Sequence, residues 1–366
     1  MKVLHLGKFC PPTEGGIEVF TYDLLGYLNK IGVKADLLCF GRKDEFSMYK
    51  NFSFFSSKTH IKLNSAPLSL SYIKRFLKIQ SDYEIIHIHS PNPLAELLTI
   101  FTNKPVIVHW HSDIVKQKLS YLFYKPLQQK VLKKARKIIC TSPQYLQTSI
   151  QLKNFKEKSV VVPLGLDFKR LSFGKRDNKF SKFLKIRKNK KVVLSIGRLV
   201  EYKGFEYLIE AGKYINDNVN IVIIGEGPSY DILSKKIKKL KLENKVFLFG
   251  KVKSIAEYIK SCDVFVLPSI SRNEAFGLVL VEALYFGKPL ITTNVYGSGM
   301  SYVNQNKKTG LIVPPRNSQA LAKAINEILS NEEIYKYFSR NAIERFKEFN
   351  IDTIGNKILK LYENVI

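Results

Sequence analysis

Two basic residues five positions apart follow an apolar run in the second half of the sequence. Arg198 and Lys203 lie between Gly197 and Gly204, and glycine permits a close approach of a ligand to the backbone. A pair of cations at the end of a strand can neutralise a diphosphate and stabilise it as it departs. The pattern predicts an anion-binding site, and an ordinary pair of surface cations is the alternative.

Two glutamates eight positions apart mark a second candidate site. Glu274 and Glu282 follow the apolar run VFVLPS, and on a helix the eight steps bring them to within about 80° of each other. Glu282 lies among Val, Leu and Ala, where a carboxylate without a partner is costly and ligand hydroxyls would supply one. A helix-face acid for Glu282 and a favourable first-turn acid for Glu274 are the alternatives. The expected helix begins with N–H groups that could hold phosphate oxygens, those of Phe276, Gly277 and Leu278.

The first half of the sequence contributes a glycine pair and a polar strand end. Gly15 and Gly16 separate the first apolar run from a helical pattern, and a helix N-terminus there can bind phosphate. The GxGxxG dinucleotide fingerprint is absent. His111 and Asp113 lie where the strand pattern that begins at Val106 ends, so either could contact the reacting carbon or the hydroxyls of a substrate. A plain turn and a structural histidine are the alternatives.

Short apolar runs alternate with amphipathic stretches in both halves of the sequence, which predicts two α/β domains with doubly wound parallel sheets. We expect the first domain at 1–168, a basic linker at 169–191 and the second domain at 192–345. A C-terminal helix at 346–366 is expected to pack back towards the first domain. Ligands of such sheets bind outside the carboxyl ends of the strands, so motifs that follow strands are the site candidates. The expected strands are 3–7, 35–40, 85–89, 106–111, 137–141, 192–197, 221–225, 246–249, 264–268 and 289–292.

The composition is that of a globular protein and excludes several other classes. Of 366 residues, 45% are hydrophobic and 25% are charged, unlike disordered or collagen-like chains. The four cysteines form no CxxC pair and the histidines form no cluster in the sequence, so we expect free thiols, no metal site and a reducing cytoplasm. No apolar run approaches the ~18–20 residues of a membrane-spanning helix, and the apolar start is too short for a signal peptide.

The formal charge of +28, from 59 Lys and Arg against 31 Asp and Glu, indicates an anionic partner. The excess is spread over both halves, with two concentrations. Residues 114–156 contain ten Lys or Arg and no acid, and residues 169–191 contain eleven and a single acid, Asp177. A solvated surface rich in Lys is the alternative interpretation of either segment.

These motifs, in this order, resemble those of glycosyltransferase family 4, the retaining enzymes with a GT-B fold. The resemblance covers nearly the whole chain. Its most specific element is E-x7-E, Glu274 to Glu282, within SRNEAFGLVLVEALYFGKPLI, and GRLVEYKG and GGIEVF support it. It implies two facing Rossmann-like domains with an interdomain cleft. The segments HSDIVKQK and SYVNQNKKTGLIVPP further resemble bacterial O-antigen and exopolysaccharide mannosyltransferases that use GDP-mannose.

The resemblance also implies a role for each candidate residue at the donor. Arg198 and Lys203 would bind the donor diphosphate, and Gly16 would lie against the same phosphates. Glu282 would bind the ribose hydroxyls, and Glu274 would hold hydroxyls of the transferred sugar. Further donor contacts would come from the backbone of Val252, which would meet the base, and from the helix start at Phe276, Gly277 and Leu278.

His111 would lie beside the anomeric centre, so the expected catalytic set is His111, Glu274, Arg198 and Lys203. No D-x-D motif occurs, which fits metal-independent stabilisation of the leaving group by the two cations. The implied reaction is a front-face substitution in which the departing phosphate takes the proton of the acceptor. It needs no covalent nucleophile and no cofactor besides the nucleotide-sugar substrate.

The acceptor that the resemblance implies is a glycan on a polyprenyl diphosphate, at the inner face of the cytoplasmic membrane. The basic segment 114–156 lies in the first domain, which would bind this acceptor, and we expect it to contact anionic headgroups. A UDP-sugar carrying glucose, galactose or N-acetylglucosamine is the alternative donor. The basic residues expected at the membrane are Lys125, Lys130, Lys133, Lys134 and Lys137.

Two other classes of protein are the competing interpretations. A sugar-nucleotide epimerase would bind the same donor but would need acid/base groups and no acceptor. A nucleic-acid-binding protein would account for the charge, and the helix expected at 229–240 is rich in Lys, but no recognised binding motif accompanies it. We therefore expect no nucleic-acid partner.

Overall fold

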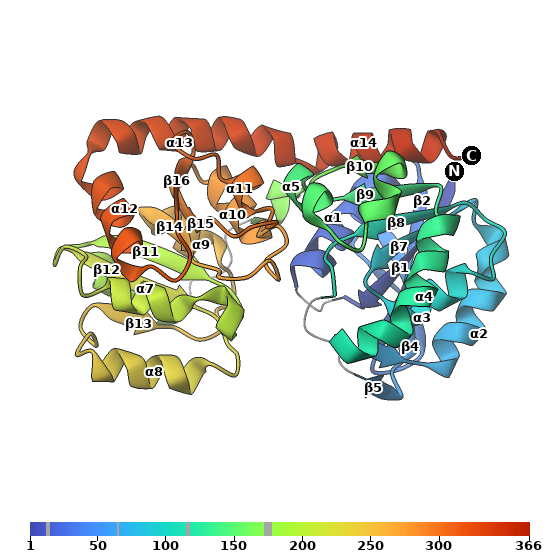
Figure 1. The fold of residues 1–366 in the computed structure, drawn as a ribbon, viewed down its shortest axis with the longest axis horizontal. Helices are drawn as coiled ribbons and strands as arrows, with labels where there is room; N and C mark the ends of the chain where they lie inside the picture. The colour runs from blue at the N-terminus through green and yellow to red at the C-terminus, as the bar shows by residue number, and fades with distance from the viewer. Residues whose placement is uncertain (12–14, 64–65, 115–117, 172–177) are drawn as a thin grey trace. The chain divides into compact units, whose positions relative to one another are not determined.

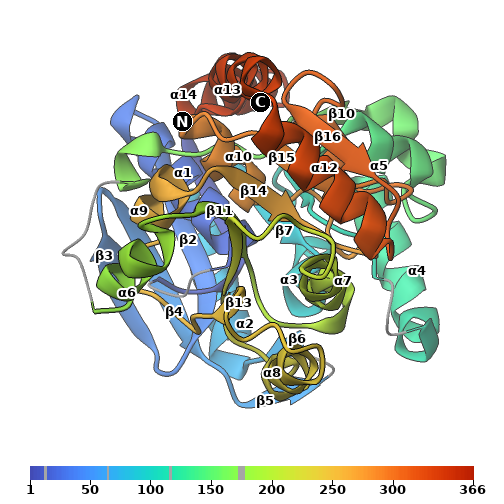
Figure 2. The ribbon, with the colours of Figure 1, turned by 90° about the vertical axis from the view of Figure 1, so that its left-hand side faces the viewer.

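The computed structural model describes residues 1–11, 15–63, 66–114, 118–171 and 178–366. These residues form two compact units, and each has a main sheet of its own with helices around it (Figures 1 and 2). The first unit comprises Met1–Leu166 together with Asn350–Ile366, and the second comprises Asp167–Phe349. The C-terminal end of the chain therefore belongs to the same unit as the N-terminus.

The first unit is built on an eight-stranded sheet in the order β10-β9-β8-β7-β1-β2-β4-β3, parallel except for the pair β3 and β4. Its central strands are almost continuous runs of buried residues, as in a parallel sheet covered on both faces. A separate hairpin pairs β5 (Ile61–Leu63) with β6 (Ala66–Leu68). The strands of the main sheet are β1 (Lys2–Phe9), β2 (Lys34–Gly41), β3 (Glu45–Tyr49), β4 (Phe52–Lys58), β7 (Ile85–Ser90), β8 (Val106–Trp110), β9 (Lys137–Cys140) and β10 (Ser159–Val161).

Helices from both ends of the chain pack in this unit. Helix α1 follows β1, and α14 near the C-terminus packs against it, with the Tyr27 hydroxyl donating to Oδ1 of Asn356 at 2.8 Å. This contact brings Tyr362, on α14, into the core of the first unit, where it is fully buried. The helices of the unit are α1 (Gly16–Lys30), α2 (Leu70–Ile79), α3 (Pro93–Thr99), α4 (Lys118–Lys134), α5 (Pro143–Thr148) and α14 (Ile351–Glu363).

The second unit has a six-stranded parallel sheet in the order β13-β12-β11-β14-β15-β16. Numbered along the unit, this order is 3-2-1-4-5-6, that of a Rossmann sheet. Helices α7 and α8 lie side by side, and α12 packs against α7 over a core of Val, Leu and Ile side chains (Figures 1 and 2). The strands are β11 (Lys191–Ile196), β12 (Val219–Ile224), β13 (Val246–Leu248), β14 (Val264–Leu267), β15 (Leu290–Thr293) and β16 (Gly310–Val313), and the helices are α6 (Asn178–Arg187), α7 (Phe205–Ala211), α8 (Tyr230–Lys239), α9 (Ala256–Ser261), α10 (Leu278–Tyr285), α11 (Met300–Val303), α12 (Ser318–Ser330) and α13 (Glu332–Phe346).

The segment 169–191, expected to be a basic interdomain linker, contains helix α6 of the second unit. Phe180 and Phe183 are buried on this helix and pack against the ring of Tyr258 on α9. Because these two aromatic residues lie three positions apart, they share one face of the helix despite the basic residues around them. Residues 172–177 of the expected linker lie outside the described part of the chain.

The expectation of four free thiols is wrong for two of the cysteines. Cys10 and Cys39 form a disulfide, with 5.2 Å between their Cα atoms. They are far apart in the sequence, but β1 and β2 are parallel neighbours and bring the end of one strand beside the other. Cys140 and Cys262 are buried free cysteines.

None of the helices within the described residues is long and apolar enough to cross a membrane. The helix α4, for example, has 17 residues and includes Pro126 and several lysines.

Candidate active site

Arg198 and Lys203 follow β11, the strand at which the order of the second sheet reverses. In a doubly wound sheet this point opens a crevice at the carboxyl ends of the strands, and ligands bind there. A short 3-10 turn, Glu201–Lys203, comes after the strand and buries the Lys203 side chain, whereas Arg198 remains exposed. One cation is therefore fixed by the protein and the other faces solvent.

Lys203 and Glu274 form a buried ion pair that the sequence did not reveal. Nζ of Lys203 lies 2.5 Å from Oε2 of Glu274, and the Ser269 hydroxyl donates to the same oxygen at 3.2 Å. Burial alone would lower the pKa of Lys203, but the charge of Glu274 and the hydrogen bond to it raise the pKa above its ordinary value. Lys203 therefore carries its charge at neutral pH, and Glu274 fixes the position of the ammonium.

The loop that carries Glu274 is held by its neighbours. The Ile270 N–H donates to the Tyr202 carbonyl at 2.8 Å, which ties the loop to the segment after β11. The Ser298 hydroxyl donates to the backbone carbonyl of Glu274 from the other side. The carboxylate is thus positioned by contacts of the backbone on which it stands, as a preorganised site requires.

Gly204 lets the segments after β11 and β14 touch. Its φ of +66° lies in the left-handed region, and a Cβ there would lie only 2.2 Å from the Pro268 carbonyl oxygen. Any larger residue would meet both backbone strain and this contact. The glycine therefore sets the distance between the strand ends that carry Lys203 and Glu274.

Helix α10 begins directly after the Glu274 loop, as the sequence predicts. Gly277 is its N-cap, with φ +82°, and the described residues supply no side chain that caps the helix. Glu282 lies within this helix and is only 5% exposed. Val252 follows β13 and is half-buried, so it also lies at the carboxyl edge of this sheet.

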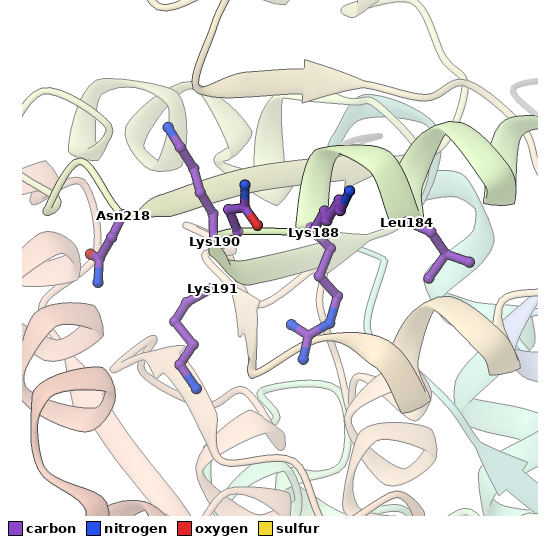
Figure 3. Close-up of a pocket in the computed structure, with 7 residues that line it drawn as sticks. Leu184, Lys188, Lys190, Lys191 and Asn218 are labelled. Carbon is purple, nitrogen blue, oxygen red and sulfur yellow. The ribbon is translucent and has the colours of Figure 1, made fainter.

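The pocket drawn in Figure 3 lies at the opposite edge of the same sheet. Its volume is about 470 Å³, and Lys191 at the start of β11 and Asn218 just before β12 help to line it. Two of its basic residues, Arg187 and Lys191, pair with Asp263. Because ligands of doubly wound sheets bind at the carboxyl ends of the strands, this basic pocket is not the candidate active site.

In the first unit, Gly16 and His111 also lie at the carboxyl edge of a sheet. Gly16 begins α1 directly after the N-cap Gly15, and described side chains do not cap this helix. His111 follows β8, is almost fully buried, and its backbone N–H donates to the Ser90 carbonyl at 3.0 Å. The strand order of this sheet reverses at β1, which precedes α1.

His111 belongs to a buried cluster of five histidines, which we did not expect from the sequence. Strands β1, β7 and β8 are parallel neighbours in which His5 opposes His87, and His89 opposes His109. Alternate residues of a strand share a face, so both His-x-His pairs and His5 project to the same side. Two triplets of these residues place a ring nitrogen from each within 4.8 Å of the others. The signal in the sequence was the His-x-His spacing in two strands expected to be neighbours.

Burial keeps the five rings of this cluster neutral. It lowers the pKa of each histidine well below the ordinary value, to about 3 for His89. At neutral pH each ring therefore carries one N–H and one bare nitrogen. His111 enters any reaction as a neutral imidazole that donates at one nitrogen and accepts at the other.

Asp113, the other polar candidate after β8, forms hydrogen bonds with neighbouring residues of the first unit. Its Oδ1 accepts hydrogen bonds from Nε1 of Trp110 at 3.0 Å and from the Ser149 hydroxyl at 2.6 Å. Its backbone N–H donates to the Tyr145 hydroxyl at 2.6 Å. Asp113 therefore shapes the turn after β8.

The five lysines expected at a membrane differ in their surroundings. Lys125, Lys130 and Lys133 are exposed on α4, and Lys137, at the start of β9, is half-buried. Lys134 donates to the Ile100 carbonyl at 2.7 Å and to the Thr102 carbonyl, so it holds the segment after α3. The structure thus separates three exposed lysines from one that has a structural partner.

Comparisons with known proteins identify the family. Residues 14–170 match the family described as Glycosyltransferase Family 4, and residues 176–345 match Glycosyl transferases group 1. The O-antigen chain mannosyltransferase C of Escherichia coli is 34% identical over 100% of this chain and 99% of its own length. The D-rhamnosyltransferase WbpZ of Pseudomonas aeruginosa is 29% identical over 95% of this chain and 92% of its own length.

Solved structures share the fold. Anabaena Alr3699/HepE in complex with UDP has a TM-score of 0.81 at 21% identity, over 100% of both chains. WaaG, a glycosyltransferase involved in lipopolysaccharide biosynthesis, has a TM-score of 0.72 at 15% identity, over 99% of both chains. The chain belongs to glycosyltransferase family 4. It is a glycosyltransferase with the GT-B fold, which confirms the resemblance found in the sequence.

Proposed function

We propose that the protein is a retaining hexosyltransferase that moves mannose from GDP-mannose to a lipid-linked glycan of a bacterial surface polysaccharide, O-antigen or capsule. The observation that carries the proposal is the buried Lys203–Glu274 ion pair beside Arg198, at the switch point of the second sheet. A fixed ammonium and an exposed guanidinium suit a diphosphate leaving group. The E. coli relative, named as a mannosyltransferase, supports the choice of sugar.

In this proposal the second unit holds the donor. Arg198 and Lys203 bind its diphosphate, and Glu282 binds the ribose hydroxyls from within α10. Glu274 gives Oε2 to Lys203 and Ser269, which leaves its other oxygen to accept a hydroxyl of the sugar. The backbone at Val252 meets the base, and further phosphate contacts come from the N–H groups of Phe276, Gly277 and Leu278.

The proposed reaction is a front-face substitution. The acceptor hydroxyl attacks the anomeric carbon on the side from which the nucleoside diphosphate departs. The bond from that carbon to the diphosphate oxygen breaks, and the departing phosphate takes the acceptor's proton. Arg198 and Lys203 stabilise the negative charge that develops on the leaving group, which is the role a divalent cation has in metal-dependent transfer.

In the first unit, Gly16 is proposed to lie against the donor phosphates and His111 beside the anomeric carbon. Both residues lie at the carboxyl edge of their sheet, where a doubly wound fold presents its ligands. His111 is neutral and keeps an unpartnered ring nitrogen, Nδ1, among the described residues. A neutral imidazole can hold a sugar hydroxyl without adding charge beside the reacting carbon.

We further propose that the acceptor is a polyprenyl-diphosphate glycan, met by a protein bound peripherally at the inner face of the cytoplasmic membrane. On α4, Leu122 and Phe123 are 64% and 88% exposed, close in sequence to the exposed Lys125. Apolar and basic side chains on one helix suit an interface with anionic lipid. An E. coli relative named UDP-Gal:alpha-D-GlcNAc-diphosphoundecaprenol alpha-1,3-galactosyltransferase, 27% identical, supports a lipid diphosphate acceptor.

A UDP-sugar is the second candidate donor. The observation that favours it is the likeness to Anabaena Alr3699/HepE in complex with UDP-glucose, which has a TM-score of 0.82 at 21% identity. The same cations and carboxylates would serve this donor, because the diphosphate and the ribose are common to both nucleotides. Only the contacts to the base and the sugar would differ.

Thermal stabilisation by a panel of nucleotide sugars tests the donor. GDP-mannose at about 100 times its Kd should add roughly 2.7 kcal/mol to the free energy of unfolding and raise Tm by several degrees. UDP-glucose, UDP-galactose and UDP-N-acetylglucosamine should do less. Arg198→Ala should remove most of the shift without lowering Tm of the free protein, since Arg198 is exposed. Stabilisation by a UDP-sugar alone would make that sugar the donor instead.

A further inference from the structure

Three of the clustered histidines form a line of hydrogen-bonded rings that ends at His111. Nδ1 of His5 lies 3.1 Å from Nε2 of His89, and Nδ1 of His89 lies 2.9 Å from Nε2 of His111. The Thr21 hydroxyl, which donates to the Ile17 carbonyl at 2.8 Å, is a longer neighbour of His89 Nδ1 at 3.3 Å. The shorter contacts therefore connect ring to ring.

The Tyr362 hydroxyl joins this line to the remaining two rings. It lies 3.2 Å from Nε2 of His5 and 2.6 Å from Nδ1 of His87. Nε2 of His87 in turn lies 3.3 Å from Nδ1 of His109. The result is one continuous chain of six groups from His111 to His109, with the tyrosine from α14 in its middle.

The geometry of His89 and His111 fits a hydrogen bond between Nδ1 of His89 and Nε2 of His111, and it does not fit coordination of one metal ion by these two nitrogens. The rings of His89 and His111 differ by 9° in orientation, and their centres are 5.2 Å apart. A nitrogen separation as short as 2.9 Å is then possible only if both nitrogens lie on the line between the ring centres. Each nitrogen points at the other, whereas two ligands of a metal would point at a common ion about 2.0–2.1 Å from each.

This chain of hydrogen bonds allows only two arrangements of the protons on its six groups. Each neutral ring has one N–H and one bare nitrogen, and the tyrosine hydroxyl donates to one ring and accepts from the other. The direction of any one hydrogen bond therefore sets the direction of all five. Either every ring is protonated at Nε2 or every ring is protonated at Nδ1.

The distances at Tyr362 favour one of these arrangements. The 2.6 Å contact to His87 has the length of a bond in which a hydroxyl donates, and the 3.2 Å contact to His5 suits an N–H donor. Tyr362 thus donates to His87 and accepts from Nε2–H of His5. All five rings are then protonated at Nε2, which leaves Nδ1 of His111 bare.

We propose that Tyr362 is a positioning residue that sets the tautomer of His111 through His5 and His89, so that Nδ1 of His111 accepts a hydrogen bond from a substrate hydroxyl. Nδ1 of His111 is buried and has no partner among the described residues. The role of the hydroxyl rests on the proposed function, which puts His111 beside the reacting sugar. The shared tautomer stands on the geometry of the first unit alone.

Long-range proton–nitrogen NMR on the full chain labelled with ¹⁵N-histidine reads the tautomer of each ring. We expect His5, His87, His89, His109 and His111 all to be Nε2–H, with the exposed His60 as internal reference. Tyr362→Phe removes the hydroxyl that joins His5 to His87 and so divides the chain of hydrogen bonds into two parts. His111 should then show both tautomers. Mixed tautomers in the wild type, a shared Nδ1–H form, or loss of the pattern on adding one equivalent of Zn²⁺ would each overturn the proposal.

Kinetics of glycosyl transfer supply the functional arm of the test. Tyr362→Phe should lower kcat about tenfold with little change in KM for the donor. Tyr72→Phe is the matched control, because Tyr72 is a fully buried tyrosine of the same unit whose hydroxyl donates to the Leu38 carbonyl at 3.4 Å. Full activity of Tyr362→Phe despite altered tautomers would contradict the role of Tyr362. A wild type with the expected tautomers and no transfer would instead contradict the proposed function.

Discussion

The ion pair between Lys203 and Glu274 joins two residues that the sequence presents as separate motifs. Their carboxylate and ammonium are both buried, so each depends on the other for its charge to be tolerated. The same contact fixes the cation where a diphosphate would bind. Structure and proposed chemistry thus rest on one pair of side chains, which makes substitutions there unusually informative.

Lys203→Met should affect catalysis and stability together. Loss of a fixed cation at the leaving group should lower kcat about 10²–10³-fold. The unpaired Glu274 charge should cost about 3–5 kcal/mol of unfolding free energy, measured by urea denaturation. Wild-type kcat in this variant would remove Lys203 from the catalytic set.

Two further variants separate these effects. Lys203→Met combined with Glu274→Gln should recover most of the stability but none of the activity, because no charge is left unpaired. Lys236→Met, which breaks a more exposed pair with Glu210, should change stability by less than about 1 kcal/mol and leave kcat unaltered.

At the scale of elements, neighbouring parallel strands create sites that no single strand shows. The carboxyl ends of β11 and β14 bring Lys203 to Glu274, and the register of β1, β7 and β8 assembles five histidines on one face. These contacts depend on which strands are neighbours and on their register. The geometry of each site is therefore set by the order and register of the strands in its sheet.

The histidine cluster should make the protein sensitive to acid. The unfolded chain protonates its histidines below about pH 6.5, while burial keeps the five native rings neutral, so the unfolded state binds more protons. Stability is therefore full above this pH and falls below it, by about 1.4 kcal/mol per pH unit for each ring. Urea unfolding between pH 7.5 and 5.5 measures the slope. A flat profile would refute the neutral burial of the five rings.

Gly204→Ala should disturb the active site more than the fold. The left-handed φ costs about 1–2 kcal/mol for alanine, and the Pro268 carbonyl must also move, which shifts Lys203 relative to Glu274. Gly32→Ala is the matched control, since Gly32 has φ +89° but nothing within 4 Å of the added Cβ. Both should lose comparable stability, and only Gly204→Ala should lose kcat. Equal kcat in the two variants would show that the approach of the loops is unimportant.

The sequence predicts much of the fold because buried parallel strands are apolar runs, and those at 3–7, 85–89 and 264–268 coincide with β1, β7 and β14. It does not predict the edge pair β3 and β4, whose alternating exposure gives no such run. Helix α6 was not predicted from the sequence because basic residues surround its two buried phenylalanines. The Cys10–Cys39 disulfide and the Lys203–Glu274 ion pair were not predicted either, because both are long-range contacts that depend on strand order.

For the molecule as a whole, the basic residues behind the charge of +28 have different surroundings and different proposed roles. Lys203 and Lys134 are committed to partners within the protein, one at the candidate active site and one in a structural contact. Arg198 is exposed at the candidate site. Lys125, Lys130 and Lys133 are exposed on α4 with two apolar neighbours, and these are the side chains proposed for the membrane.

Reversing three charges on α4 should weaken binding to anionic liposomes. Lys125→Glu, Lys130→Glu and Lys133→Glu together remove roughly 1 kcal/mol per lysine near the surface and add repulsion, so sedimentation with vesicles rich in phosphatidylglycerol should fall at least 100-fold. The matched control reverses Lys235, Lys238 and Lys239, three exposed lysines of α8. Equal loss in both variants would indicate a nonspecific effect of net charge, and no loss in either would rule out the α4 interface.

The most direct test of the proposed reaction is the anomeric configuration of its product. The purified chain is incubated with GDP-α-mannose and a polyprenyl-diphosphate glycan, and the new linkage is determined by NMR. The proposal predicts an α-mannoside, which keeps the donor's configuration, formed by the wild type and nearly abolished in Lys203→Met. A β-mannoside, or an α-mannoside formed equally well without Lys203, would contradict it.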